Sequence, residues 1–280
     1  MRLRGAIAAA ITPLTDGGTR LDDGSFQPLT RYLSEAALDG LLACGTTGEG
    51  LLLTVDERRR AAELFVDARP EGFAVAVHAG AQTTEQTVDL AAHAKAIDAD
   101  AVAVIAPPFF RLDDDEVLQH LKAAADACDP VPFYVYEFEA RTGYAISIKV
   151  IGALRDRAPN LAGLKVSDTP AAALDPYLDL EGLDVFIGYE PLVLGALDRG
   201  AFGAVSGLAS AWPDPVVALV RDRDAQAHDR VTHLRESLAR KPFGSSVKAV
   251  LEAKGVIGDA SVRAPLRACT DAEREAALAL

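Results

Sequence analysis

The sequence predicts an α/β fold, a (β/α)8 TIM barrel with a C-terminal helical appendage. About eight short apolar runs recur along the chain, amphipathic segments lie between them, and the last part of the chain shows helical patterns without a strand. The runs do not alternate with polar residues and are bounded by Gly or Pro, which is typical of strands buried on both faces of a parallel sheet. Strand and helix repeated about eight times is the pattern of a closed barrel.

The predicted strands are residues 6–11, 40–44, 73–79, 100–106, 132–138, 161–167, 183–188 and 202–207. The segments between them are predicted helices. One begins at Thr54, because Glu57 follows three residues later and the two form a capping box. Residues 83–97 carry an apolar stripe at helical spacing.

Further helices are predicted at residues 212–223, 228–240, 245–254 and 271–280. We therefore expect a catalytic barrel at residues 1–224 and a C-terminal helical region at 225–280. The alternative fold is an open doubly wound sheet, which usually carries a glycine-rich dinucleotide fingerprint after its first strand. The sequence has no such motif there.

The composition limits the classes of partner. Half of the 280 residues are hydrophobic and a quarter are charged, so the chain can bury a large core. The 41 acidic and 28 basic residues give a net charge of −13, which repels phosphate backbones and anionic lipid. We expect neither nucleic acid nor a membrane as a partner.

The cysteines and the first residues indicate the compartment. Cys44, Cys128 and Cys269 form no CxxC or Cys/His cluster, so we expect reduced thiols and neither a metal nor a cofactor. Two arginines precede an apolar run near the start, but Pro13 interrupts that run, which favours a strand over a signal peptide. No stretch reaches the roughly 18 apolar residues of a membrane span. We expect a soluble, cytoplasmic protein.

Lys165 is the first candidate functional residue, because active sites of barrels lie at the C-terminal ends of the strands. It occupies an apolar predicted strand, where a lysine must find a counter-charge or lose its proton. A desolvated amine is a nucleophile that can form a Schiff base with a ketone. The alternative is a lysine that extends to solvent or joins a structural ion pair.

Gly45-Thr46-Thr47-Gly48-Glu49 follows the second predicted strand. Backbone N–H groups and two hydroxyls can converge in such a turn and bind an anion. A small carboxylate suits it better than a phosphate, because the sequence has no GxxxxGK[ST] pattern. The turn could equally serve only as a tight connection, and Glu49 is interpreted as structural.

Three more candidates follow later strands. Tyr136, at the end of the fifth strand, can transfer protons or can be a core aromatic residue with a satisfied hydroxyl. Arg141, in the loop after that strand, can bind a second carboxylate or remain a solvated arginine. Gly188 follows the seventh strand.

Together these residues resemble the dihydrodipicolinate synthase / N-acetylneuraminate lyase family, whose members are Schiff-base-forming, pyruvate-handling (β/α)8 enzymes. The matching segments run in order through the whole chain: residues 10–14, 16–18, 45–49, 56–58, 107–110, 136–143, 163–165, 188 and 262–266. No single motif is decisive, but their order and spacing are specific.

The resemblance implies roles for these positions. Lys165 would form the Schiff base, Tyr136 would transfer protons, and Thr46 and Thr47 would hold the pyruvate carboxylate, with Thr47 also taking part in catalysis. Gly188 would line the same pocket. The family resemblance further implies a homotetramer and no cofactor.

Four more residues are expected near the substrate by the same resemblance. Arg141 matches the position that binds the carboxylate of the second substrate in synthases, and Phe110, Glu139 and Ser206 are expected to contact substrate. Phe110 stands where synthases have a tyrosine that joins a proton relay from the neighbouring subunit.

Other departures from the family pattern concern substrate choice. Glu139 lies two residues from Arg141, where it could neutralise the arginine or select a differently charged partner. His78 replaces a small residue, and Val166 follows Lys165 where the family has an acid.

We therefore expect an enzyme that adds pyruvate to an aldehyde, or releases it from a 2-oxo-3-deoxy acid, through a lysine imine. The alternatives are 4-hydroxy-tetrahydrodipicolinate synthase and a non-catalytic paralogue that binds a 2-oxo acid.

Overall fold

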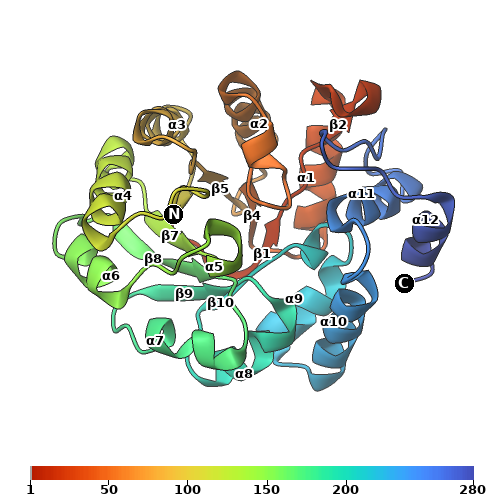
Figure 1. The fold of residues 1–280 in the computed structure, drawn as a ribbon. Helices are drawn as coiled ribbons and strands as arrows, with labels where there is room; N and C mark the ends of the chain where they lie inside the picture. The colour runs from red at the N-terminus through yellow and green to blue at the C-terminus, as the bar shows by residue number, and fades with distance from the viewer. Residues whose placement is uncertain (1) are drawn as a thin grey trace.

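The computed structural model describes residues 2–280 and contains a closed barrel of parallel strands surrounded by helices (Figure 1). The barrel strands are β1 (Gly5–Ala9), β4 (Gly40–Ala43), β5 (Ala74–His78), β6 (Ala101–Ile105), β7 (Phe133–Glu137), β8 (Leu161–Val166), β9 (Asp184–Ile187) and β10 (Gly203–Ser206). They pair in chain order, and β10 closes the barrel on β1. The predicted fold class and all eight predicted strands are confirmed.

The helices between and after the strands are α1 (Phe26–Glu35), α2 (Val55–Asp67), α3 (Thr84–Ala96), α4 (Asp114–Cys128), α5 (Glu139–Thr142), α6 (Ile148–Arg155), α7 (Asp175–Leu178), α8 (Val193–Asp198), α9 (Pro213–Asp222), α10 (Ala225–Leu238), α11 (Phe243–Ala253) and α12 (Asp271–Leu278). Short 3-10 helices lie at Asp16–Gly18, Asp23–Ser25, Gly50–Leu52, Ala171–Ala173, Glu190–Leu192 and Leu208–Ser210. The capping box predicted at Thr54 and Glu57 opens α2. A short hairpin of β2 (Leu14–Thr15) and β3 (Arg20–Leu21) follows β1 and was not predicted.

Two apolar layers hold the barrel together. One layer fills the barrel interior, where the small side chains of β5 and β6 leave room for the rings of Tyr134 and Phe186, 5.9 Å apart. The other lies between the strands and the surrounding helices. Because every strand is covered on both faces, the strands read as uninterrupted apolar runs in the sequence.

The C-terminal helices pack against the barrel rather than apart from it (Figure 1). α10 begins at Ala225, with Asp224 as its N-cap, and packs on α9 and on the 3-10 helix at Glu190–Leu192. The division into domains at residue 224 stays a prediction. Among the helices of residues 2–280, none combines the length and apolar character needed to cross a bilayer.

Candidate active site

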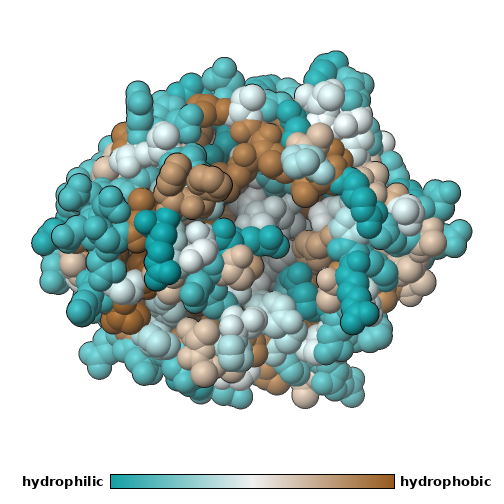
Figure 2. Space-filling view, viewed as in Figure 1, coloured by the Kyte–Doolittle hydropathy of each residue, from teal (hydrophilic) through white to brown (hydrophobic). Residues whose placement is uncertain are grey.

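A cavity of about 400 Å³ lies at the C-terminal ends of the strands. Its walls come from the turn after β4, from the ends of β5 and β6, from α5 and from the C-terminal region. The lining residues are Thr46, Thr47, Glu49, Gly50, Leu51, Leu52, His78, Ile105, Pro108, Arg141, Phe243, Gly244 and Leu266. Figure 2 shows this face of the molecule hollowed near its centre, with apolar residues around part of the hollow.

Lys165 and Tyr136 are neighbours in the β7–β8 pairing. Lys165 is 6% exposed, and its Nζ lies 3.9 Å from the centroid of the Tyr136 ring. In residues 2–280 this amino group has neither a hydrogen bond nor an ion pair with any side chain. The structural ion pair considered for Lys165 is therefore absent from this part of the chain.

The turn after β4 meets the same tyrosine. The Tyr136 hydroxyl lies 3.2 Å from Thr46 Oγ1. Glu49 N donates to Thr46 O (3.2 Å) within the turn. Thr12 Oγ1, from the segment after β1, donates to Gly48 O (2.6 Å) and so ties the turn to that segment. Amine, phenol and turn thus converge at one place, as the sequence predicted.

Gly188 is a glycine because its neighbours leave no space. A Cβ at this position would lie 2.0 Å from Ser167 Oγ and 3.0 Å from Lys165 Cε. Gly188 therefore packs directly on the lysine side chain, and Ser167, which the sequence interpretation missed, brings a hydroxyl to the same place. Ser167 follows Lys165 by two residues, so strand alternation could have identified it.

Glu49 anchors the turn to the C-terminal region. Its carboxylate forms an ion pair with Lys248 (2.5 Å) and accepts a hydrogen bond from Arg263 N (2.6 Å). The side chains of Glu49 and Lys248 are 1% and 0% exposed, and burial lowers the pKa of Lys248. The structural interpretation of Glu49 agrees with this geometry.

Ser206 has its hydroxyl engaged by protein groups. Ser206 Oγ donates to Glu190 Oε1 (2.6 Å) and accepts from Ala209 N (3.2 Å). Glu190 is 1% exposed and its other oxygen accepts from Arg235 Nε (2.8 Å). These bonds link β10 to α10, and the structure does not bring a free Ser206 hydroxyl into the cavity.

Arg141 and Glu139 face different cavities although α5 carries both. Arg141 lines the cavity at the barrel mouth, with its Cζ 5.6 Å from the centroid of the Phe138 ring. Glu139 lines a second cavity of about 640 Å³ beside Ser167 and Tyr189. In residues 2–280 no ion pair joins Glu139 to Arg141, so Glu139 does not neutralise the arginine in this structure.

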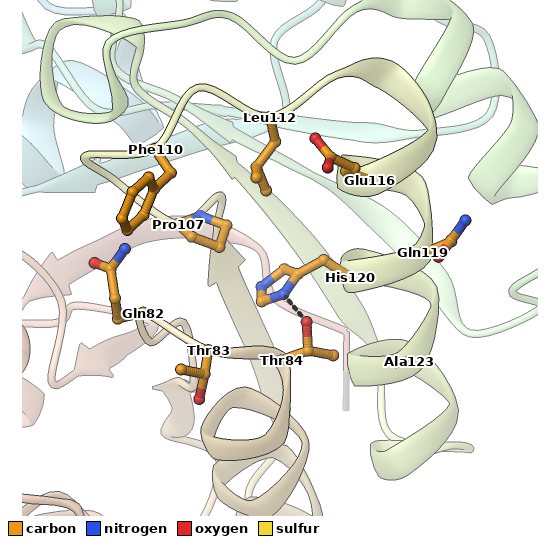
Figure 3. Close-up of a pocket in the computed structure, with 10 residues that line it drawn as sticks. All are labelled: Gln82, Thr83, Thr84, Pro107, Phe110, Leu112, Glu116, Gln119, His120 and Ala123. Atoms are coloured by element: carbon orange, nitrogen blue, oxygen red, sulfur yellow. Dashed lines mark hydrogen bonds between the residues drawn. The ribbon is translucent and has the colours of Figure 1, made fainter.

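Phe110 lies apart from the other candidates. Figure 3 shows it at a cavity of about 570 Å³ between α3 and α4, facing Gln82. His120 also lines this cavity, and its Nδ1 forms a hydrogen bond with Thr84 Oγ1 (2.9 Å). Phe110 is 64% exposed, and within this one chain it does not line the cavity that Thr46, Thr47 and Arg141 line.

A pair of carboxyl groups stands behind the site. Glu137 follows Tyr136 in β7, and its side chain is buried. Ile146 N donates to Glu137 Oε2 (2.9 Å), and Asp168 lies close to the same carboxyl group. Burial, together with Asp168, raises the pKa of Glu137 to about 8. Asp168 accepts from Glu139 N (2.8 Å) and so fixes the start of α5.

The C-terminal contribution to the cavity was missed by the sequence interpretation. Phe243, Gly244 and Leu266 close one side of it. No local signal in the sequence marks Phe243 or Gly244, and Leu266 was noted only as part of the matching segment 262–266. No group of three or more His, Cys, Asp or Glu side chains within the described residues is arranged to hold a metal ion.

Fold and site together define a (β/α)8 barrel with a buried amine, a phenol and a threonine-containing turn close together at the C-terminal ends of the strands. Residues 2–280 match the model of the dihydrodipicolinate synthetase family, and the chain belongs to that family. It is an enzyme of the lyase class, as its characterised relatives are.

The chain is similar to relatives with two different named activities. It is 30% identical to the 4-hydroxy-tetrahydrodipicolinate synthase of Syntrophus aciditrophicus, over 97% of this chain and 95% of that one. It is 36% identical to the N-acetylneuraminate lyase of Mus musculus, over 73% of this chain and 66% of that one. The N-acetylneuraminate lyase structure from Proteus mirabilis superimposes with a TM-score of 0.91 and 27% identity, covering 100% of this chain and 97% of the other.

Proposed function

We propose that the chain is a Schiff-base aldolase that adds pyruvate to an aldehyde, or releases pyruvate from a 2-oxo-3-deoxy acid. The observation that carries the proposal is the position of Lys165 Nζ, 3.9 Å from the Tyr136 ring, beside a turn that contacts the Tyr136 hydroxyl. The amine, a proton carrier and a carboxylate site are the three groups that this chemistry requires.

In the proposed reaction the Lys165 amine attacks the ketone carbon, and the carbinolamine then loses water to give an iminium. Loss of a proton from the neighbouring carbon gives an enamine, which adds to the aldehyde carbon. Tyr136 carries protons during formation and loss of the carbinolamine, and water finally hydrolyses the imine and returns the free lysine. Cleavage runs through the same steps in reverse.

The turn at Thr46 and Thr47 would hold the substrate carboxylate. The backbone N–H groups of both residues have no hydrogen-bond acceptor in the described part of the chain, and both residues line the cavity. Two N–H groups and the Thr47 hydroxyl can therefore donate to one anion.

The aldehyde partner is proposed to be neutral or polyhydroxylated. Relatives named for two different activities support the family but do not select an aldehyde partner. Phe110 lacks a phenol hydroxyl, and Glu139 and Asp168 place carboxyl groups in the cavity beside Ser167, where a second carboxylate on the substrate would be repelled. Arg141 lies in the other cavity and would favour such a carboxylate.

Two assays test the proposal. Pyruvate release is measured across a panel of 2-oxo-3-deoxy acids, and condensation of pyruvate with glyceraldehyde is compared with condensation with aspartate semialdehyde. We expect release from at least one sugar-derived acid and a higher kcat/KM with glyceraldehyde. A clear preference for the semialdehyde would instead establish synthase activity, and binding without turnover of any partner would indicate a non-catalytic paralogue.

The proposal includes assembly into a homotetramer, which the family resemblance implies. Exposed apolar side chains support an assembled state, since Phe109 is 87% exposed and Phe110, whose ring lies 5.0 Å from that of Phe109 between centroids, is 64% exposed. Sedimentation equilibrium measures the mass directly. A monomer at micromolar concentration would contradict this part of the proposal.

A further inference from the structure

Arg58 is a buried cation without an ion pair. It lies in α2, is 4% exposed, and donates from its two terminal nitrogens to Gly80 O (2.9 Å) and His78 O (2.7 Å). Its Nε has no hydrogen-bond partner, and no carboxylate in residues 2–280 lies within ion-pair distance. Carbonyl dipoles alone compensate this guanidinium, and a buried charge without a counter-ion is costly.

His78 connects that cation to the cavity. Its Nδ1 lies 3.1 Å from Cys44 O, and Ile105 N donates to its Nε2 (3.3 Å). A carbonyl only accepts and an amide N–H only donates, so the ring carries its proton on Nδ1. Burial, Arg58 and Lys165 all hold the pKa of His78 well below its ordinary value, so the ring stays neutral.

The two residues fix the ends of four neighbouring strands. Arg58 donates to the carbonyl of the last residue of β5 and to that of Gly80, two residues later. The His78 ring joins Cys44, which precedes the Gly45–Glu49 turn, to Ile105 at the end of β6. The ring also meets the Tyr136 ring edge to face, with 5.9 Å between centroids and 82° between planes. No Cβ fits at Gly80, since it would lie 2.8 Å from His78 Nε2.

We propose that Arg58 and His78 are positioning residues for the 2-oxo acid. Arg58 provides a permanent positive charge behind the cavity wall, and this charge attracts the carboxylate of the bound substrate. Arg58 also holds His78 in place, and the neutral His78 ring fixes the position of the turn relative to Tyr136. This inference rests on the proposed function, because it assumes that an anionic ketone reaches Lys165.

Two properties make the pair suited to this role. The turn itself carries no cation, and the buried Lys248 nearby is already paired with Glu49. Arg58 instead has no carboxylate partner in residues 2–280, and it donates to the carbonyl of His78, a residue that lines the cavity. An unpaired charge acts strongly where it is buried.

The test compares an anionic with a neutral ketone. Lys165 is trapped with borohydride in the presence of pyruvate or methyl pyruvate, and the concentration for half-maximal trapping gives the preference for the anion. Arg58→Lys and Arg58→Gln both lose the forked pair of hydrogen bonds, but only Arg58→Lys keeps the charge. Arg59→Gln removes a charge from the neighbouring, partly exposed position and serves as the control.

We expect Arg58→Gln to reduce the preference for pyruvate over methyl pyruvate about tenfold, while Arg58→Lys and Arg59→Gln retain it. A preference that survives in Arg58→Gln, or that falls equally in both Arg58 variants, would overturn the charge role. If the wild type traps neither ketone at Lys165, the proposed function itself fails. If the wild type traps pyruvate but the Arg58 variants keep the same preference for pyruvate over methyl pyruvate, only the role of Arg58 fails.

His78 is tested by rescue. His78→Asn can still donate to Cys44 O, whereas His78→Leu cannot. We expect His78→Leu to slow trapping of both ketones alike, with most of the rate restored in His78→Asn, and circular dichroism to show both variants folded. Equal rates in His78→Leu and the wild type would remove His78 from the positioning role.

Discussion

The amino nitrogen of Lys165 lies over the face of the Tyr136 ring, 3.9 Å from its centroid, and the hydroxyl of the same ring contacts Thr46 at 3.2 Å. One tyrosine thus connects the amine to the turn. The ring is 1% exposed and pairs in register with Lys165 across β7 and β8, so its position is set by the barrel backbone.

Tyr136→Phe separates binding from chemistry. The ring that lies beside Lys165 is kept, so pyruvate should still be trapped, but kcat should fall by about 10²–10⁴-fold because a positioned proton carrier is lost. Tyr134→Phe is the matched control, since Tyr134 accepts a hydrogen bond from Leu3 N deep in the barrel. An unchanged kcat in Tyr136→Phe would make this residue a packing residue only.

Gly188→Ala tests the close packing around the lysine. The new Cβ would lie 2.0 Å from Ser167 Oγ and 3.0 Å from Lys165 Cε, so Ser167 must move and the lysine is crowded. We expect trapping of pyruvate to slow at least about tenfold. Gly195→Ala, in α8, meets no atom within 4 Å and should behave as the wild type. Normal trapping in Gly188→Ala would show that the amine needs no fixed position.

Glu137→Gln tests the carboxyl pair through the pH dependence of stability. The pKa of Glu137 is raised to about 8 in the folded chain, from 4.5, so the folded state holds a proton that the unfolded state releases. Stability from this group is therefore complete below about pH 4.5 and is lost as the pH rises toward about 8. Urea unfolding between pH 5 and 8 should show a shallower loss of stability in Glu137→Gln than in the wild type.

The control for that measurement is Glu181→Gln, at an exposed position. Its stability should follow the wild type across the same pH range. Parallel curves for the wild type and Glu137→Gln would show that Glu137 binds no additional proton on folding.

Lys248→Met tests the buried ion pair. It leaves the Glu49 carboxylate buried without its cation, which we expect to destabilise the chain by about 3–5 kcal/mol. The double variant with Glu49→Gln should recover part of that loss, because no uncompensated charge remains. Urea unfolding of the four proteins measures the coupling, and additive effects would contradict the pairing seen between these side chains.

The strands and most of the site were predictable for one physical reason. Strands of a closed parallel barrel are buried on both faces, so their apolar runs stand out, and their C-terminal ends meet at one opening. Lys165, Tyr136 and the turn after β4 were therefore expected to lie together, and the geometry confirms that they do.

The remainder depends on tertiary contacts that leave no local signal. Phe243 and Leu266 line the cavity, and the ion pair of Glu49 with Lys248 joins residues about 200 positions apart in the sequence at this side of the barrel. Glu139 was interpreted as a residue that could neutralise Arg141 or select a differently charged partner. The loop that carries both residues is a helical turn, α5, and the two side chains line different cavities. Arg58 was noted only as part of the matching segment 56–58, because the role proposed for it follows from its burial and its missing counter-ion.

The most direct test of the central claim is mass spectrometry of the protein treated with pyruvate and borohydride. We expect a single reduced adduct on Lys165 and none in Lys165→Ala. Lys149→Ala, changed at an exposed position in α6, should be labelled as the wild type is. Labelling that maps to another lysine, or that persists in Lys165→Ala, would contradict the account.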